Sequence, residues 1–266
     1  MSEKIGFIGA GNMATAIISG ILSKNLYSPE NVYAYDTNPE AVSKISKKNV
    51  TVCSGIDEIL ALCPIVFLAV KPQVYPTVLG QCSGSVKNNL FVSIAAGIST
   101  KYVQSFVGEN CAVIRAMPNT PLMLGSGATA LCKSANTSDA QFEKVEGIFA
   151  ASGVVCRLPE DKMNAVISVN GSSPAYVYLF AKAVIEGAKD QGIDPETAAK
   201  LIISTLRGSA DMLENSGYTP DELIKMVSSP GGTTLKALDV LYAGNFETVI
   251  KVAMRACTGR AEELGK

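Results

Sequence analysis

The feature that most constrains the fold is a small-residue turn between an apolar segment and a helical segment near the N-terminus. Residues 4–8 predict a buried strand, and residues 14–24 predict a helix with one apolar face. Between them, Gly9, Gly11 and Ala14 follow the spacing G-x-G-x-x-A. In this strand–turn–helix context, the spacing predicts that the helix N-terminus binds the pyrophosphate of a dinucleotide. The alternative is an ordinary tight turn in an α/β sheet.

An acidic residue supports the dinucleotide interpretation. Residues 32–35 predict a second buried strand, which ends at Asp36. Asp36 stands at about the spacing from the glycines at which an acidic side chain binds the adenosine ribose. A carboxylate there accepts hydrogen bonds from a ribose 2′-hydroxyl and repels a 2′-phosphate. NADPH and NADH both remain candidate cofactors, and Asp36 favours NADH.

Charge and hydropathy argue against several kinds of partner. The chain has 266 residues with a formal net charge of −1, and it contains no run of Lys or Arg. Neither nucleic acid nor an anionic membrane surface is therefore an expected partner. The longest apolar stretch, residues 59–70, is interrupted by Pro64 and is shorter than the about 20 residues that a membrane-spanning helix needs. The predicted strand near the N-terminus leaves no room for a signal peptide.

Histidine and cysteine usage narrows the chemistry. The chain has no histidine, which excludes a Ser-His-Asp triad, a Cys-His pair and histidine-based zinc sites. The seven cysteines are scattered and form no C-x-x-C pair. We therefore predict free thiols, a cytoplasmic protein and no metal site. Any proton transfer has to use Lys, Tyr, Ser, Thr, a carboxylate or water.

Strand and helix patterns alternate through residues 1–159. This alternation predicts a Rossmann-like, doubly wound, mostly parallel sheet, with residues 126–131 and 154–157 as late edge strands. Because ligands bind beyond the carboxyl ends of such strands, the predicted cofactor residues follow the strands. They are Ile8, Gly9, Ala10, Gly11, Asn12, Met13, Asp36, Ala69, Val70, Lys71, Pro72, Ala95, Ala96 and Gly97. For Lys71 we favour backbone contact with the nicotinamide over proton transfer, with its side chain solvated or paired.

From residue 160 to residue 266 the pattern is helical throughout. Apolar stripes predict that Val177, Phe180 and Val184 share one face, and that Leu201 and Leu213 point inward. A helical domain of about 105 residues is too small to bury the apolar faces of all its helices without a partner. The sequence therefore predicts an all-helical second domain that forms a homodimer. The alternative is that this domain packs only on its own first domain.

Five motifs occur in an order that resembles the pyrroline-5-carboxylate reductase family over the whole chain. They are Gly9–Met13, Ala69–Gln73, Arg115–Pro121, Gly171–Tyr176 and Ser229–Thr234, of which the last is the most specific. The resemblance implies reduction of 1-pyrroline-5-carboxylate to L-proline by a nicotinamide hydride, the last step of proline biosynthesis. It also implies a homodimer interlocked through the helical domain, which in this family is often assembled further into a ring of dimers. The implied substrate residues are Met117, Pro118, Asn119, Gly231, Gly232, Thr233 and Thr234, with Thr234 as the proton donor or hydrogen-bond partner.

The residues themselves suit that chemistry. The small-residue loop at 228–234 opens into a helix, so it offers free backbone N–H groups to a substrate carboxylate. A protonated cyclic imine accepts hydride readily, so a hydroxyl such as that of Thr234 suffices to orient the nitrogen. An equally weighted alternative is that Thr234 is a helix N-cap. Tyr176 fits packing better than catalysis.

Two other functions stay open, and two positions depart from the family pattern. A β-hydroxyacid-dehydrogenase-like or other imine reductase shares the layout, but such enzymes rely on a lysine that residues 171–174 do not supply. A non-catalytic dinucleotide-sensing dimer is the alternative of another class. The family often carries small polar residues where Asp36 and its neighbours stand, and Asn where Ile56 stands. Both departures bear on the choice between NADPH and NADH.

Overall fold

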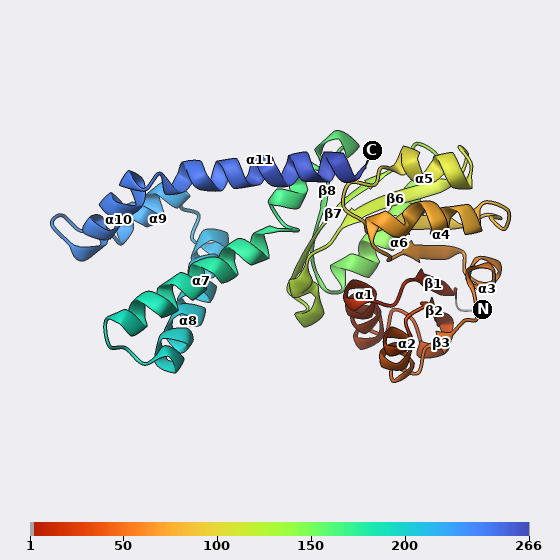
Figure 1. Ribbon diagram of the computed structural model, residues 1–266, viewed down its shortest axis with the longest axis horizontal. Helices are drawn as coiled ribbons and strands as arrows, with labels where there is room; N and C mark the ends of the chain where they lie inside the picture. The colour runs from red at the N-terminus through yellow and green to blue at the C-terminus, as the bar shows by residue number, and fades with distance from the viewer. Residues whose placement is uncertain (1–2, 266) are drawn as a thin grey trace. The chain divides into compact units, whose positions relative to one another are not determined.

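A computed structural model describes residues 3–265 of the chain, and Figure 1 shows its elements. The chain forms two compact units. One comprises the residues up to 174 together with those from 255 onward, and the other comprises residues 175–254. The predicted domain boundary between residues 159 and 160 stays a prediction.

The first unit is built on an eight-stranded sheet with the order β3-β2-β1-β4-β5-β6-β7-β8. Every neighbouring pair is parallel except β6 and β7, which are antiparallel. The doubly wound, mostly parallel sheet is therefore confirmed. The strands are β1 (Ile5–Ile8), β2 (Val32–Tyr35), β3 (Thr51–Val52), β4 (Ile65–Leu68), β5 (Leu90–Ser93), β6 (Ala112–Met117), β7 (Gly127–Lys133) and β8 (Gly153–Arg157).

Helices cover both faces of this sheet, so its central strands are apolar on both sides. Alternate side chains enter two separate cores: Phe7 and Phe67 lie on one face and stack with ring centroids 4.7 Å apart, whereas Ile8 and Leu68 lie on the other. The first face packs against α1 (Asn12–Ser23), α2 (Pro39–Ser46) and α6 (Asp139–Ala150). The second packs against α3 (Ile56–Leu62), α4 (Tyr75–Cys82) and α5 (Thr100–Val107).

Local sequence signals explain several of the helix ends. Ser138 and Gln141 form a capping box at the start of α6, as the pattern S-x-x-Q predicts. Ser99 caps α5 by accepting the N–H of Tyr102. Pro72 opens a 3-10 turn, η2 (Pro72–Val74), directly before α4. Short 3-10 turns also occur as η1 (Pro29–Asn31) and η3 (Thr120–Leu124).

One predicted helix is wrong. The sequence predicts a helix over residues 161–170, but the structure has two 3-10 turns there, η4 (Glu160–Lys162) and η5 (Ala165–Ser168). The Asn170 amide nitrogen donates to the backbone oxygens of Met117 and Ala128, at 2.7 and 2.8 Å. These bonds tie the segment to the ends of β6 and β7. Long-range tertiary bonds therefore hold it where its apolar spacing predicts a helix.

The second unit contains helices only, in the part of the chain that the structure describes. They are α7 (Ser173–Asp190), α8 (Pro195–Asn215), α9 (Pro220–Met226), α10 (Thr233–Ala243) and the first turns of α11 (Phe246–Leu264). Among its described residues, Ala198 and Ile202 are the ones that are fully buried. The predicted inward positions are therefore wrong for the isolated chain, since Leu201 is 62% exposed and Leu213 is 55% exposed. The apolar stripes face outward because the unit has almost no core of its own.

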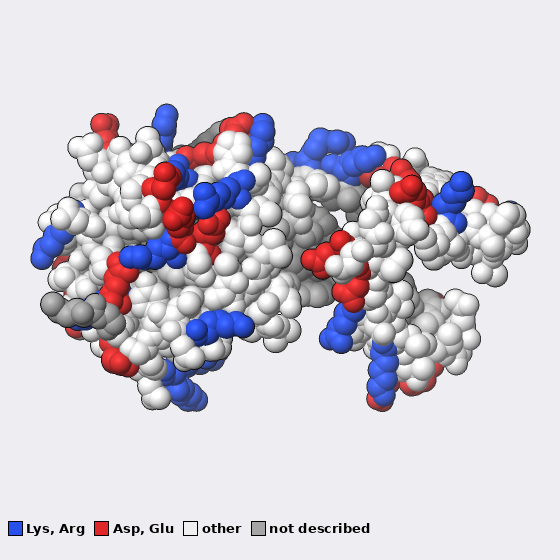
Figure 2. Space-filling model, turned by 180° about the vertical axis from the view of Figure 1, so that it is seen from behind, with Lys and Arg blue, Asp and Glu red and all other residues white. Residues whose placement is uncertain are grey.

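The surface and the helices bear on possible partners. Figure 2 shows Lys and Arg interspersed with Asp and Glu over the visible face, so charges of the two signs are mixed there. Within residues 3–265, each helix is either too short or too polar to cross a membrane.

Candidate active site

The loop after β1 has the backbone shape that a dinucleotide phosphate requires. Gly9 has a φ of +99°, and its N–H donates to the backbone oxygen of Tyr35 at 2.8 Å. A Cβ at Gly9 would lie 2.6 Å from the backbone oxygen of Ala69, so only glycine fits between β1 and β4. Gly11 is the N-cap of α1, is exposed, and has open space where a Cβ would stand.

The N-terminus of α1 is free to bind an anion. It has no side-chain cap and no acidic residue in its first turn. The first N–H groups of a helix have no partner within the helix, and they point along its positive end. The start of α1 therefore presents backbone N–H donors at the carboxyl edge of the sheet, where the sequence predicts the pyrophosphate.

Asp36 lies beside this loop, as its position after β2 predicts. Its Oδ2 accepts the N–H of Ala10 at 2.7 Å, and its Oδ1 accepts the N–H of Asn38 at 2.8 Å. The carboxylate thus links the loop after β1 to the start of α2. Within the described chain, neither oxygen is paired with a Lys or Arg side chain. The half-buried Asp36 keeps further lone pairs that could accept a hydrogen bond from a ribose hydroxyl.

A second carboxylate, that of Glu58 in α3, is bonded to the segment that follows the neighbouring strand. The N–H of Cys53 donates to the backbone oxygen of Ala34, so the end of β3 runs beside the end of β2. The next residue, Ser54, donates both its N–H and its hydroxyl to Oε2 of Glu58, at 2.8 and 2.9 Å. These bonds hold the pKa of Glu58 below its usual range, so it carries its charge at neutral pH. Asp36 and Glu58 thus place two carboxylates beside the ends of the adjacent strands β2 and β3.

The predicted cofactor residues after β4 and β5 lie on the same sheet edge as the Gly9 loop, because β1, β4 and β5 are adjacent parallel strands. Lys71 is exposed, and its side chain has no hydrogen-bond partner in the described chain. Tyr75 joins the ends of β4 and β5. Its hydroxyl donates to the backbone oxygen of Leu68 at 2.8 Å and lies 3.0 Å from Oγ of Ser93. Burial raises the pKa of Tyr75, so it stays a neutral structural donor.

The residues after β6 are mostly inside the protein. Asn119 is 8% exposed; its Oδ1 accepts the N–H of Ala128 at 2.9 Å, and its amide nitrogen donates to the backbone oxygen of Asn170 at 3.2 Å. Pro118 is buried and Met117 is half-buried. In this state the Asn119 side chain holds the loop in place, and its predicted contact with substrate stays a prediction.

The loop before α10 has the geometry of an anion site, within the helical unit. Gly231 has a φ of +71°, and the N–H of Gly232 donates to the backbone oxygen of Ser229 at 2.9 Å. Gly232 is the N-cap of α10, which has no side-chain cap and no acidic residue in its first turn. Thr233 and Thr234 are the first two helical residues. The alternative interpretation of Thr234 as the N-cap is therefore wrong, because Gly232 occupies that position.

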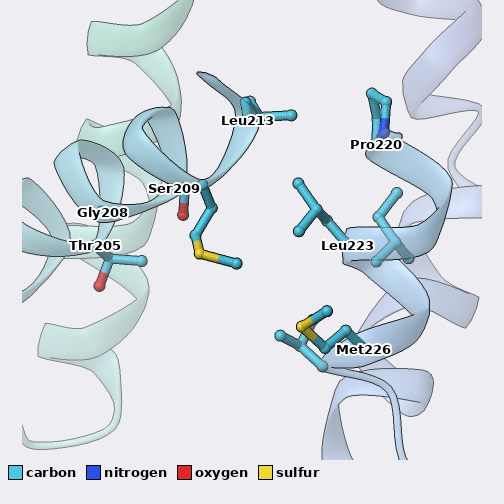
Figure 3. Close-up of a pocket in the computed structure, with 10 residues that line it drawn as sticks. Thr205, Gly208, Ser209, Leu213, Pro220, Leu223 and Met226 are labelled. Carbon is cyan, nitrogen blue, oxygen red and sulfur yellow. The ribbon is translucent and has the colours of Figure 1, made fainter. Parts of the chain in front are cut away.

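The helical unit also contains an apolar cavity of about 650 Å³ between α8 and α9 (Figure 3). In Figure 3, Leu213 and Leu223 project into it from opposite helices, with Met226 at its lower end. Thr205 and Ser209 add hydroxyl groups to a wall that is otherwise apolar. A cavity of this composition suits apolar side chains better than a charged metabolite.

Sequence reasoning missed a buried polar cluster behind the loop that follows β5. Glu160 accepts the N–H of Thr100 at 2.6 Å and its hydroxyl at 2.5 Å, at the start of α5. Nearby, Arg115 is 4% exposed and donates to Oδ1 of Asn164 at 2.5 Å. Burial lowers the pKa of Arg115, and the charge of Glu160 opposes that shift. The residues that meet are about 45 to 60 positions apart, so no local spacing signals the cluster.

The described residues include no group of three or more His, Cys, Asp or Glu that could hold a metal ion. The fold, the glycine loop at the N-terminus of α1 and the acidic residue after β2 define a nicotinamide-dependent oxidoreductase. A family described as "NADP oxidoreductase coenzyme F420-dependent" matches residues 4–97. A family described as "Pyrroline-5-carboxylate reductase dimerisation" matches residues 160–264.

Curated relatives identify the family over the full length. The chain is 36% identical to pyrroline-5-carboxylate reductase of Synechocystis sp., with 100% of both chains covered. It is 34% identical to that of Escherichia coli K12, again with 100% of both covered. The solved structure of the Plasmodium falciparum enzyme, which has NADP bound, has a TM-score of 0.93 at 28% identity and covers 100% of this chain and 99% of its own. The chain belongs to the pyrroline-5-carboxylate reductase family.

Proposed function

We propose that this chain reduces 1-pyrroline-5-carboxylate to L-proline with a hydride from a reduced nicotinamide dinucleotide. The observation that supports this most is the pair of uncapped helix N-termini. α1 opens at the glycine loop of the sheet unit, and α10 opens at Gly232 of the helical unit. The first suits a pyrophosphate and the second suits the carboxylate of a small acid. Membership of the family supplies the substrate class.

The reaction requires little acid–base catalysis by the protein. Hydride adds to the carbon of the C=N bond and the nitrogen takes a proton, which gives the secondary amine. A protonated imine already carries that proton and accepts hydride directly. Hydride donation belongs to the cofactor, so the chain mainly has to position the two reactants. This suits a chain without histidine.

The placement of each residue supports the following proposed roles. The backbone of Gly9–Met13 binds the pyrophosphate, Asp36 accepts from the ribose, and the backbones of Ala69–Pro72 and Ala95–Gly97 border the nicotinamide. The N–H groups around Gly232, Thr233 and Thr234 bind the substrate carboxylate. The hydroxyl of Thr234 is at the second helical position and takes no part in capping, so it is available to orient the imine nitrogen.

We further propose that NADH is used at least as well as NADPH. The negative charges of Asp36 and Glu58 at adjacent strand ends support this preference, since a 2′-phosphate would be repelled. The variant Asp36→Ser is expected to raise the ratio of kcat/KM for NADPH over NADH by about tenfold or more. Asp36→Asn, which keeps an oxygen for Ala10 but removes the charge, is expected to shift the ratio in the same direction. A wild-type enzyme that strongly prefers NADPH would overturn the preference.

The decisive test of the activity is loss of reduced nicotinamide when pyrroline-5-carboxylate is added to the purified chain. Proline formation is measured in the same mixture by chromatography. Turnover that occurs with small 3-hydroxy acids and oxidised cofactor instead would favour a β-hydroxyacid-dehydrogenase-like enzyme. Dinucleotide binding without turnover of any substrate would favour the non-catalytic sensor.

We also propose that the working protein is a cytoplasmic homodimer. The match of residues 160–264 to the dimerisation family and the outward apolar stripes of α7 and α8 support the dimer. All seven cysteines are free thiols, which suits a reducing compartment. Association of dimers into a ring is a further step, which the molar mass in solution distinguishes from a simple pair.

A further inference from the structure

The last turns of α11 return to the sheet unit and pack on the loop that follows β5. Residues from 255 onward belong to that unit by their contacts, although α11 begins in the helical unit. Ala261 is 3% exposed and is the buried residue of α11 in the described chain. The most buried point of this long helix is therefore close to its end.

The packing at this point is between two backbones. Gly97 is buried and has a φ of +83°. A Cβ on Gly97 would collide with the backbone oxygen of Ala261 and would lie 3.1 Å from both the Cβ of Leu264 and the nitrogen of Gly265. In return, a Cβ on Gly265 would collide with the backbone oxygen of Gly97. Neither position has room for a single methyl group.

The rest of the loop is already fixed from other directions. Ala95 is 5% exposed and Ile98 is 1% exposed. Thr100, which follows this loop, is held by Glu160, which accepts both its N–H and its hydroxyl. Four residues before Ala261 on the same helix, Sγ of Cys257 lies 3.2 Å from Oγ of Ser172. The end of α11 is thus held to the body of the unit and supplies the contact that limits where Gly97 can lie.

We infer that residues 257–265 of α11 form a positioning element for the nicotinamide of the bound cofactor. This inference rests on the proposed function, in which the backbone of Ala95–Gly97 borders the nicotinamide. A Cβ at Gly265 meets the backbone oxygen of Gly97, and a larger side chain at the buried Ala261 shifts the end of α11, whose backbone oxygen contacts Gly97. Because the loop is held at Ala95 and Thr100, the movement is concentrated at Ala96 and Gly97. Cofactor binding and hydride transfer then suffer, while the substrate loop at 229–234 is unchanged.

The test compares two variants at the contact with one control on the same helix. Ala261→Leu adds bulk at the buried position, and Gly265→Ala adds one methyl group at the reciprocal contact. Ala256→Leu is the control, because Ala256 is exposed in the same segment of α11. NADH and NADPH are titrated by fluorescence, and kcat and both KM values are measured. We expect both contact variants to raise the cofactor Kd and KM about tenfold, with the KM for pyrroline-5-carboxylate within about twofold of wild type.

Each outcome decides one question. If Ala261→Leu does not fold, Gly265→Ala tests the inference instead, because Gly265 belongs to neither hydrophobic core of the sheet unit. Unchanged cofactor Kd and KM in a folded contact variant overturn the inference, as does an equal loss in Ala256→Leu. A parallel rise in the substrate KM also overturns it, since that indicates general damage. A wild-type chain that binds neither dinucleotide contradicts the proposed function itself.

Discussion

Burial decides which cysteine side chains can react. Burial raises the pKa of Cys63, Cys82 and Cys132 to about 12, and that of Cys53 to about 11. These thiols stay protonated at about pH 8, and a protonated thiol is a poor nucleophile. Cys156, by contrast, is exposed on β8.

We therefore expect a disulfide reagent at about pH 8 to modify Cys156 first in the native protein, with the four buried thiols reacting only after unfolding. The unfolded chain, without reductant, should give all seven thiols. The variant Cys156→Ser should remove the fast phase and leave six. A total of five or fewer in the wild type would mean that a disulfide forms.

The substrate loop gives a prediction for Gly232. A Cβ there would lie 2.6 Å from Oγ and 2.9 Å from the backbone oxygen of Ser229, so Gly232→Val distorts the loop and its N–H donors. Loss of one charged hydrogen bond costs about 1.5–3 kcal/mol, which corresponds to a fall of about ten- to a hundredfold in kcat/KM for the imine. NADH binding by fluorescence should stay within about twofold of wild type, because the proposed cofactor residues are in the other unit. A normal KM for pyrroline-5-carboxylate would mean that its carboxylate binds elsewhere.

Variants of Thr234 distinguish a helix cap from a substrate contact, two roles between which the sequence does not decide. A threonine beside two glycines at a helix start fits either a cap or a substrate contact, and the choice depends on the backbone angles of Gly231 and Gly232. Since Gly232 is the cap, Thr234→Val should lower kcat while the melting temperature stays unchanged. Thr234→Ser, which restores the hydroxyl, should recover most of the rate. A fall in melting temperature with normal kcat would contradict the catalytic role.

Among the elements, the start of α5 depends on a carboxylate that is distant in sequence. Glu160→Gln weakens the two bonds to Thr100 and removes a negative charge from the helix N-terminus. We expect the free energy of unfolding in urea to fall by about 1–2 kcal/mol. The matched control is Asp161→Asn, whose exposed ion pair with Lys162 is worth at most about 1 kcal/mol. Equal effects of the two variants would show that the bonds to Thr100 contribute nothing special.

Some of the secondary-structure elements could be predicted from the sequence, and others could not. The strands and helices that form the cofactor edge were predictable, because buried parallel strands are continuous apolar runs and their ends carry glycine, proline or an acid. The conformation of residues 161–170 was not predictable, since the amide of Asn170 donates to the distant backbone oxygens of Met117 and Ala128. The burial of Asn119 and the contact of Gly97 with Ala261 could not be predicted either, because they too depend on segments that are distant in the sequence. Pairings between distant segments leave no local pattern.

For the whole molecule, the helical unit is the part that needs a partner. Its apolar stripes were predicted correctly as stripes, but they lie on the outside of the isolated chain. We expect light scattering to give at least twice the protomer mass of 27.9 kDa at micromolar concentration. Leu201→Glu on α8 should weaken this association. Val154→Glu on β8, where the side chain is also 62% exposed, should leave it unchanged. A monomeric wild type would contradict the dimer.

The return of α11 to the sheet unit also sets an order of events during synthesis. The ribosome makes Gly97 early, but Ala261 and Gly265 only after the whole of residues 175–254. The cofactor loop therefore stays uncovered through most of translation, and closing the contact requires a long chain segment to come back. A nascent chain stalled before α11 has the glycine loop for the phosphates but lacks the cover on Gly97. The contact between Gly97 and the end of α11 can thus form only after residues 175–254 have been synthesised.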